Sequence, residues 1–250
     1  MRFDIVTLFP ELFEPHLRLG ITRRAFCADR VDVRLWPLRD YAEGSYRRVD
    51  DRPYGGGPGM VLLAAPLLRA VDAVLADRQA PCEVIHFSPS GVRLTQPLVR
   101  QLAQGQGAVL VCGRYEGVDQ RFLDARVTLQ ISLGDYVLSG GELPALALLD
   151  AVARLQPGVL AGDSAAHESF EEGLLEGACY SRPESLVIDG AERRVPAVLL
   201  AGHHAEAERF RRRQALWATA TRRPDLIEAA RRMGKLDAGD EAYLCQMQLE

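Results

Sequence analysis

Two glycine-rich segments in the middle of the chain have the residue types and spacing from which a ligand pocket can be built. The first covers residues 111–119 (VCGRYEGVD) and the second covers residues 131–144 (ISLGDYVLSGGELP). Each begins where an apolar, strand-like run ends. In open α/β sheets, ligands lie beyond the carboxyl ends of the strands, and glycine lets the backbone approach a ligand closely. The sequence therefore predicts that these segments form two walls of one pocket.

Three further features could contribute polar groups to such a pocket. Residues 47–60 (RRVDDRPYGGGPGM) are too polar for a core element, which is typical of a functional loop or of a structural turn. Asp150 and Arg154 stand four residues apart on a predicted helix, where they could serve catalysis or form an ion pair. Glu168 lies in a segment without periodicity, and a carboxylate there could close over a site.

Several common chemistries are not indicated. The sequence contains no P-loop, nucleophile-elbow or zinc-protease motif, and residues 55–59 lack the preceding strand and the third glycine of a dinucleotide-binding loop. The five histidines form no ligand cluster, so no metal site is predicted. The five cysteines include no CxxC pair, which favours reduced thiols in the cytoplasm, with Cys112 as a small buried apolar residue.

The composition is that of a soluble globular protein. The chain has 250 residues, of which 48% are hydrophobic and 26% charged, enough for one or two domains. Neither a secretory signal nor an apolar run long enough to span a membrane is evident. We therefore expect a cytoplasmic protein with no membrane partner.

The charge is distributed unevenly. Residues 209–235 contain nine Lys or Arg and two acidic residues, a net charge of +7 in a chain whose total is −4. Such a run is either a solvated helix face or a surface for a polyanion. The interleaved Phe210 and Trp217 favour nucleic acid.

The order of predicted elements indicates an α/β domain followed by a smaller one. Strands are predicted over 2–8, 31–36, 83–87, 107–112 and 127–132, and helices over 66–78, 96–104, 119–125 and 144–155. This alternation is typical of a mainly parallel sheet. Residues 157–183 lose periodicity, and the chain beyond Pro196 becomes helical and rich in Arg and Ala.

Several long motifs resemble those of bacterial tRNA (guanine-N1)-methyltransferases, a family of the knotted SPOUT superfamily. The longest motifs are residues 132–144 and 49–60, and shorter ones cover 111–117, 7–11 and 180–184. The resemblance implies a mainly parallel sheet with a deep trefoil knot, where sequence reasoning alone gives an unknotted doubly wound sheet. Together with the patterns described above, it gives three regions: a knotted catalytic domain over 1–160, a linker or lid over 161–183, and a small all-α, tRNA-binding domain over 184–250.

The resemblance implies a reaction: transfer of a methyl group from S-adenosylmethionine to N1 of the guanosine at position 37 of tRNA, next to the anticodon. This guanine loses a proton from N1 while charge develops on O6, so a carboxylate base and a cationic or hydrogen-bonding partner for O6 are needed. By the resemblance, Glu168 is the base and Arg154 stabilises O6, with Tyr115 and Glu116 placing the base. The family usually carries aspartate at the position of Glu168, and Asp163 is the alternative base.

The same resemblance implies binding residues and partners. The donor is expected to contact Ser88, Pro89, Gly113, Tyr115, Glu116, Gly117, Leu133, Gly134, Asp135, Tyr136, Val137, Leu138, Gly140, Gly141 and Pro144. The tRNA is expected to contact Asp50, Gly59, Glu116, Arg211, Arg212 and Arg213. Mg²⁺ assistance and a homodimer with shared active sites are also implied, and DNA is not expected as a partner. Two alternatives stay open: a non-catalytic RNA-binding protein, and a SPOUT enzyme that methylates a ribose 2′-hydroxyl or another base.

Overall fold

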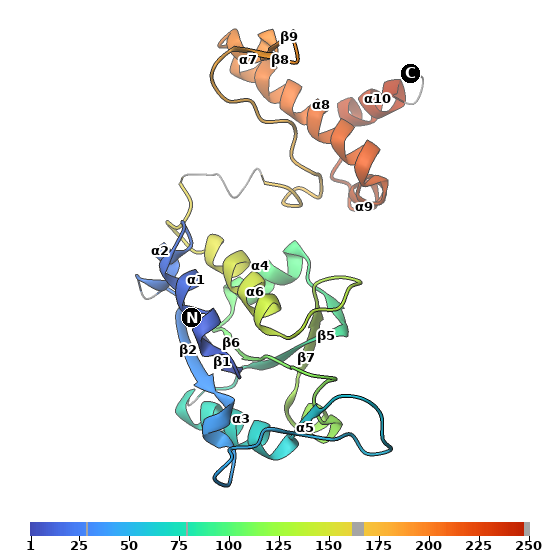
Figure 1. Ribbon diagram of the computed structural model, residues 1–250. Coiled ribbons are helices and arrows are strands. Elements are labelled where there is room, and N and C mark those ends of the chain that lie inside the picture. Colours follow the sequence, from blue (N-terminus) through green and yellow to red (C-terminus); the bar gives the residue numbers. More distant parts are fainter. Residues whose placement is uncertain (29, 79, 162–167, 248–250) are drawn as a thin grey trace. The chain divides into compact units, whose positions relative to one another are not determined.

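The structure, a computed structural model, describes residues 1–250 except 29, 79, 162–167 and 248–250 (Figure 1). The chain divides into two compact units, Met1–Gly162 and Asp163–Glu250. None of the helices in the described part of the chain combines the length and the apolar character that a bilayer crossing requires.

The first unit contains a five-stranded parallel sheet with strand order β2-β1-β6-β5-β7. Its strands are β1 (Arg2–Thr7), β2 (Asp32–Pro37), β5 (Glu83–Arg93), β6 (Ala108–Val111) and β7 (Leu129–Ser132), so all five predicted strands are confirmed. Every residue of β6 is buried, as expected of a parallel strand covered on both faces. Strand β5 extends beyond the predicted range of 83–87. Its residues 88–91 bulge out of the pairing with β7, so that Phe87 and Val92 both pair with Ile131.

Helices cover both faces of this sheet (Figure 1). The core on one face contains residues of α2 (Arg23–Phe26), α4 (Gln96–Gln104) and α6 (Glu142–Arg154), and Leu17 of α1 (Glu14–Arg18) packs against it. The core on the other face contains residues of α3 (Ala64–Arg78) and α5 (Gln120–Arg126). Within β1, Ile5 belongs to the first core and Val6 to the second, because successive strand residues point to opposite faces. The short elements are η1 (Pro10–Leu12), η2 (Leu38–Tyr41), β3 (Asp50–Asp51) and β4 (Val61–Leu62).

The four predicted helices are confirmed, with α6 beginning two residues before the expected Pro144. Proline fits there because the N–H groups of a first helical turn have no intrahelical acceptor.

The segment before α6 crosses the end of β6. Although α6 follows the edge strand β7, the N–H of Gly141 donates to the carbonyl of Gly113 at 2.9 Å. A Cβ at Gly141 would lie 2.7 Å from Cys112 Cα, so only glycine fits this crossing without a shift of the backbone. The chain therefore passes from the edge of the sheet back to its middle before α6 begins.

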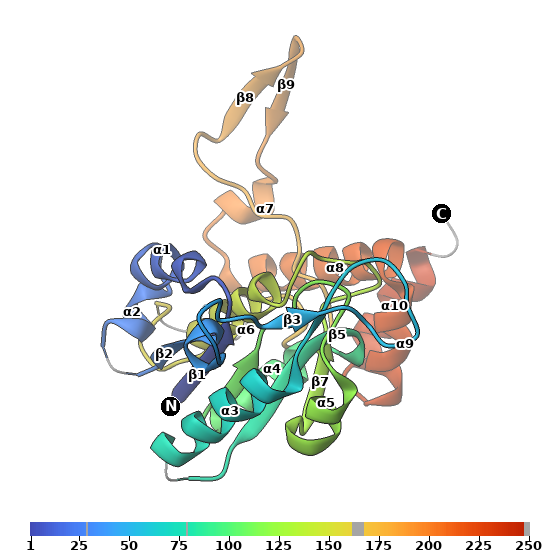
Figure 2. The same cartoon turned by 60° about the horizontal axis from the view of Figure 1, so that its bottom comes forward.

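The second unit is built mainly of helices. They are α7 (Ala197–Leu200), α8 (His204–Arg222), α9 (Pro224–Arg232) and α10 (Ala238–Met247). A small core around Leu216, Ile227 and Leu244 joins α8, α9 and α10. This unit is not all-α as predicted, because β8 (Ser185–Ile188) and β9 (Ala191–Arg194) form an antiparallel hairpin (Figure 2). Asp189 and Gly190 have φ values of 51° and 76°, as a tight two-residue hairpin turn requires.

Candidate active site

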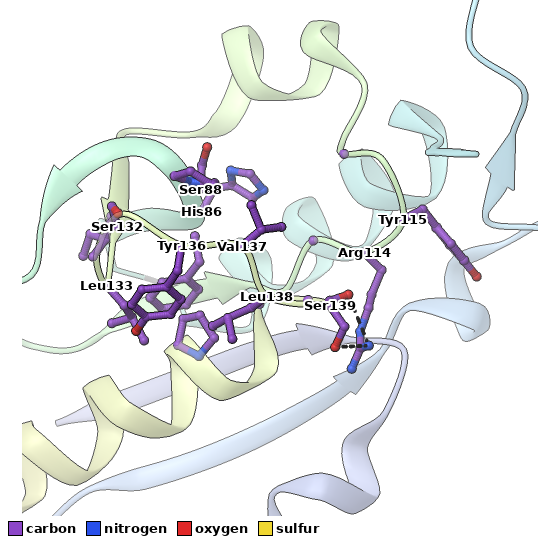
Figure 3. Close-up of a pocket in the computed structure, with 18 of the residues that line it drawn as sticks. His86, Ser88, Arg114, Tyr115, Ser132, Leu133, Tyr136, Val137, Leu138 and Ser139 are labelled. Atoms are coloured by element: carbon purple, nitrogen blue, oxygen red, sulfur yellow. Dashed lines mark hydrogen bonds between the residues drawn. The ribbon is translucent and has the colours of Figure 1, made fainter. Parts of the chain in front are cut away.

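A pocket of about 300 Å³ lies beside the bulge of β5 and just beyond the carboxyl ends of β6 and β7. It is lined by His86, Phe87, Ser88, Pro89, Gly113, Arg114, Tyr115, Glu116, Gly117, Ile131, Ser132, Leu133, Gly134, Tyr136, Val137, Leu138, Ser139, Gly140, Gly141 and Pro144 (Figure 3). The structure thus brings together every residue predicted to contact the donor except Asp135, which does not line the cavity. The two glycine-rich segments do form walls of one pocket.

Side chains that shape the cavity pack against the glycines where these walls meet. A Cβ at Gly140 would lie 2.3 Å from Arg114 Nε, and one at Gly113 would lie 2.9 Å from His86 Nε2. Side chains at these positions would displace the groups that shape the cavity.

A buried carboxylate lies beside the pocket. Glu142, in the first turn of α6, is fully buried; Thr7 Oγ1 donates to one of its oxygens at 2.9 Å and Arg114 Nε to the other at 2.9 Å. The sequence reasoning did not single out Glu142 or Arg114. The available signal was a charged residue between Gly141 and the apolar run of α6.

His86 is a second group that the sequence reasoning missed. Its side chain is 6% exposed, and burial lowers its pKa from 6.5 to about 4 against the opposing effect of a hydrogen bond with Gln130. Its Nδ1 is buried and has no hydrogen-bond partner among the described residues. A neutral imidazole with an unsatisfied nitrogen therefore borders the cavity.

We expect acid to destabilise the protein through His86. Between pH 6.5 and about 4 the unfolded chain binds a proton at this residue while the folded chain does not, so the free energy of unfolding falls as the pH drops through that window. In His86→Gln this part of the pH dependence should vanish. Urea unfolding at several pH values between 4 and 7 measures it, and equal slopes for the two proteins would contradict the expectation.

The polar loop over residues 47–60 lies against one wall of the pocket. Glu116 N–H donates to the carbonyl of Met60 at 3.0 Å, and a Cβ at Gly59 would lie 2.3 Å from Glu116 Cγ. Gly59 and Glu116, both predicted to contact tRNA, are therefore neighbours. Asp50 lies in β3, where it pairs with Leu62 of β4.

The structure does not bring Arg154 to this pocket. The pocket meets α6 at Gly141 and Pro144, whereas Arg154 is the last residue of the helix. At 1.5 Å per residue, the helical rise from Pro144 to Arg154 is about 15 Å. Asp150 Oδ1, one turn earlier, lies 4.0 Å from His16 Nε2.

The predicted base lies in the other unit. Glu168 is half-buried, and its carbonyl accepts the N–H of Glu171 at 3.3 Å in a tight turn. The alternative base, Asp163, lies outside the described residues.

The three consecutive arginines of α8 differ from one another. Arg212 donates to Asp240 at 2.8 Å and to Glu172 at 2.6 Å, so its guanidinium holds its own unit together. Arg211 and Arg213 are exposed, and the Arg213 guanidinium lies 5.5 Å from the centroid of the Tyr243 ring. The prediction treated the three as equivalent, but only Arg211 and Arg213 present their side chains at the surface.

The described residues form no metal site, and Cys112 is not placed for thiol chemistry. In the part of the chain that the structure describes, no three His, Cys, Asp or Glu side chains gather in an arrangement that could hold a metal ion. Cys112 is buried, as predicted, and burial raises the pKa of its thiol well above the usual range. This cysteine is therefore a core residue and not a nucleophile.

Comparison with known proteins identifies close relatives over the whole chain. The sequence profile of the family described as tRNA (Guanine-1)-methyltransferase TrmD matches residues 1–229. The tRNA (guanine-N(1)-)-methyltransferase of Leptothrix cholodnii is 62% identical over 251 residues, covering 100% of both chains. The proteins of the same name from Paracidovorax citrulli and Methylibium petroleiphilum are 59% and 60% identical, each covering at least 97% of both chains.

Proposed function

The chain belongs to the tRNA (guanine-1)-methyltransferase family, and on that premise we propose how it methylates guanine N1 of tRNA. The proposed donor is S-adenosylmethionine, and the proposed acceptor is the guanosine at position 37, next to the anticodon. The observation that carries the proposal is the glycine-walled pocket at the carboxyl edge of the sheet.

The pocket suits a nucleoside-like donor. Its volume of about 300 Å³ is at the lower end for small-molecule sites. Glycine backbone groups can pair with the polar edges of an adenine and a ribose. The sulfonium of the bound donor supplies an electrophilic methyl group.

The acceptor requires two groups from this chain. As the N1–methyl bond forms and the sulfur–methyl bond breaks, the N1 proton passes to the carboxylate of Glu168. Arg154 donates hydrogen bonds to O6 and stabilises the negative charge that develops there. The guanine must first leave its base stack, because a stacked base does not expose N1 to an enzyme.

We propose that each active site combines two subunits of a homodimer. The rise of about 15 Å along α6 separates Arg154 from the pocket of its own unit. A second copy can instead bring its Arg154 and Glu168 to that pocket, since a two-fold interface places the same surface on both partners.

A trefoil knot is also part of the proposal. The passage of residues 139–142 beside 112–114, with Arg114 and Gly140 paired, supports it. In such a knot the crossing itself would build the donor pocket, which accounts for the glycines at the contact.

We propose that the second unit binds tRNA through the exposed arginines of α8. Replacing Arg211 and Arg213 with alanine should weaken tRNA binding and reduce the dependence of affinity on salt by about one unit of slope per lost phosphate contact. Donor affinity should not change. Filter binding over a range of salt concentrations measures the slope, with Arg126→Ala, which removes an arginine paired to Asp72, as control. A slope equal to that of the unmodified protein would mean that α8 presents only a solvated face.

The proposed function is tested by mass-spectrometric mapping of methylated nucleosides in a tRNA pool treated with the enzyme and S-adenosylmethionine. We expect 1-methylguanosine at position 37. A methyl group on a ribose or at another position would overturn the proposed site of methylation. Mg²⁺ assistance and a cytoplasmic location belong to the same proposal; chelation with EDTA followed by readdition of Mg²⁺ tests the first.

A further inference from the structure

We propose that Arg114 and Glu142 are positioning residues that lock the two walls of the donor pocket together. The inference rests on the proposed function, since it concerns how that pocket is held ready for S-adenosylmethionine. Arg114 lines the wall that follows β6, and Glu142 comes directly after Gly141, a residue of the wall that follows β7.

Glu142 lies in the protein interior, where a negative charge requires a partner. A fully buried carboxylate is strongly destabilising unless it is paired and hydrogen-bonded. Thr7 and Arg114 supply the two hydrogen bonds, one to each oxygen. Three segments far apart in the sequence therefore meet at one carboxylate: the end of β1, the loop after β6 and the first turn of α6.

Arg114 makes contacts on three sides. Its Nη1 lies 3.3 Å from both the carbonyl and the hydroxyl oxygen of Ser139 (Figure 3). Its Nε donates to Glu142, and its guanidinium carbon lies 4.6 Å from the centroid of the Phe9 ring. One side chain thus holds both the helix start and the loop that leads to it. Because Arg114 also lines the cavity, this contact is part of the pocket wall.

The wall between β7 and α6 depends on this contact. Near its start, Ser132 Oγ accepts the N–H of Gly134 and the Gly134 carbonyl accepts the N–H of Tyr136, which are short-range bonds within the loop. Tyr136 and Val137 are 55% and 86% exposed, so packing holds them weakly. The far end of this wall is held against the other one by the side-chain ties from Arg114 to Ser139 and Glu142, beside the backbone bond from Gly141 to Gly113.

The test compares two buried carboxylates, Glu142 and Asp4, each paired with an arginine from another segment. Arg114→Lys keeps a positive charge near Glu142, but a single ammonium cannot reproduce the fork that reaches both Glu142 and Ser139. Asp4→Asn is the matched control: Asp4 is fully buried and pairs with Arg78 at 2.6 Å, and neither residue lines the pocket. Glu142→Gln keeps the size of the side chain and a hydrogen-bonding amide, and should lose less than Arg114→Lys.

We expect Arg114→Lys to raise the dissociation constant for S-adenosylmethionine, measured by calorimetry, by roughly tenfold or more. In the free protein, the amides of residues 133–141 should exchange with deuterium faster than in the unmodified protein. Asp4→Asn should lower the melting temperature while leaving the donor affinity and the exchange of these amides unchanged.

Two results would overturn the inference. One is an Arg114→Lys protein with unchanged donor affinity and unchanged exchange over 133–141. The other is loss of donor affinity in Asp4→Asn as large as in Arg114→Lys, which would mean that general stability sets the affinity. If the unmodified protein failed to bind S-adenosylmethionine, the proposed donor would be wrong, and the exchange measurement on the free protein would still decide whether the lock exists.

Discussion

Replacing Glu168 with glutamine is expected to reduce the rate of methyl transfer by about 10²–10⁴-fold, the usual effect of removing a general base. A neutral amide cannot accept the N1 proton, while its size and hydrogen-bonding capacity preserve the local turn. The fold, the donor affinity and most of the tRNA affinity should therefore remain. Single-turnover methyl transfer, with tRNA well above its dissociation constant, isolates the chemical step from binding.

Glu168→Asp is the matched control, because it keeps the carboxylate and restores the residue that the resemblance leads one to expect. It should stay active. A Glu168→Gln protein with nearly normal single-turnover rates would show that another group takes the proton, and Asp163 and Asp50 would be the next candidates.

The pocket walls could be predicted because their determinants are local. Glycines directly after buried strands indicate that the backbone there approaches a ligand or another segment closely. Parallel strands bring their carboxyl ends to the same edge of the sheet, so these glycines lie near one another. The register of β5, β6 and β7 then places Gly113 and Gly134 at one cavity.

The roles of the polar side chains could not be predicted, because their hydrogen-bond partners lie far away in the sequence. Glu142 lies 135 residues from Thr7 and 28 from Arg114, so nothing near it in the chain reveals its pairing. Arg212 looks like its neighbours in a basic run, yet Asp240, 28 residues away, binds it. His86 lies in an apolar strand, and only the folded structure shows that its Nδ1 is left without a partner among the described residues.

The hairpin over residues 185–194 differs from these cases, because a local sequence pattern was enough to predict it. An apolar run followed by Asp189-Gly190 is a strong hairpin pattern. The helical pattern begins only beyond Pro196, so it does not apply to these residues.

Mixing two inactive variants is expected to restore activity if active sites are shared between subunits. Arg154→Ala removes the group proposed to bind O6, and Leu138→Trp fills the donor pocket, with loss of S-adenosylmethionine binding verified first. Each variant alone has two defective sites per dimer. In a mixed dimer, the intact pocket of the Arg154→Ala subunit meets the intact Arg154 of its partner.

One of the two sites in each mixed dimer is therefore complete, and random exchange of subunits makes half of the dimers mixed. The mixture should recover about a quarter of the activity of the unmodified protein, measured as methyl transfer to tRNA after the subunits have been dissociated and reassociated. A site built within one chain gives no recovery, because each chain then carries its own defect. A fully active monomer in sedimentation experiments would contradict the shared site equally, and the distance between Arg154 and its own pocket would then have to be closed by a movement of α6.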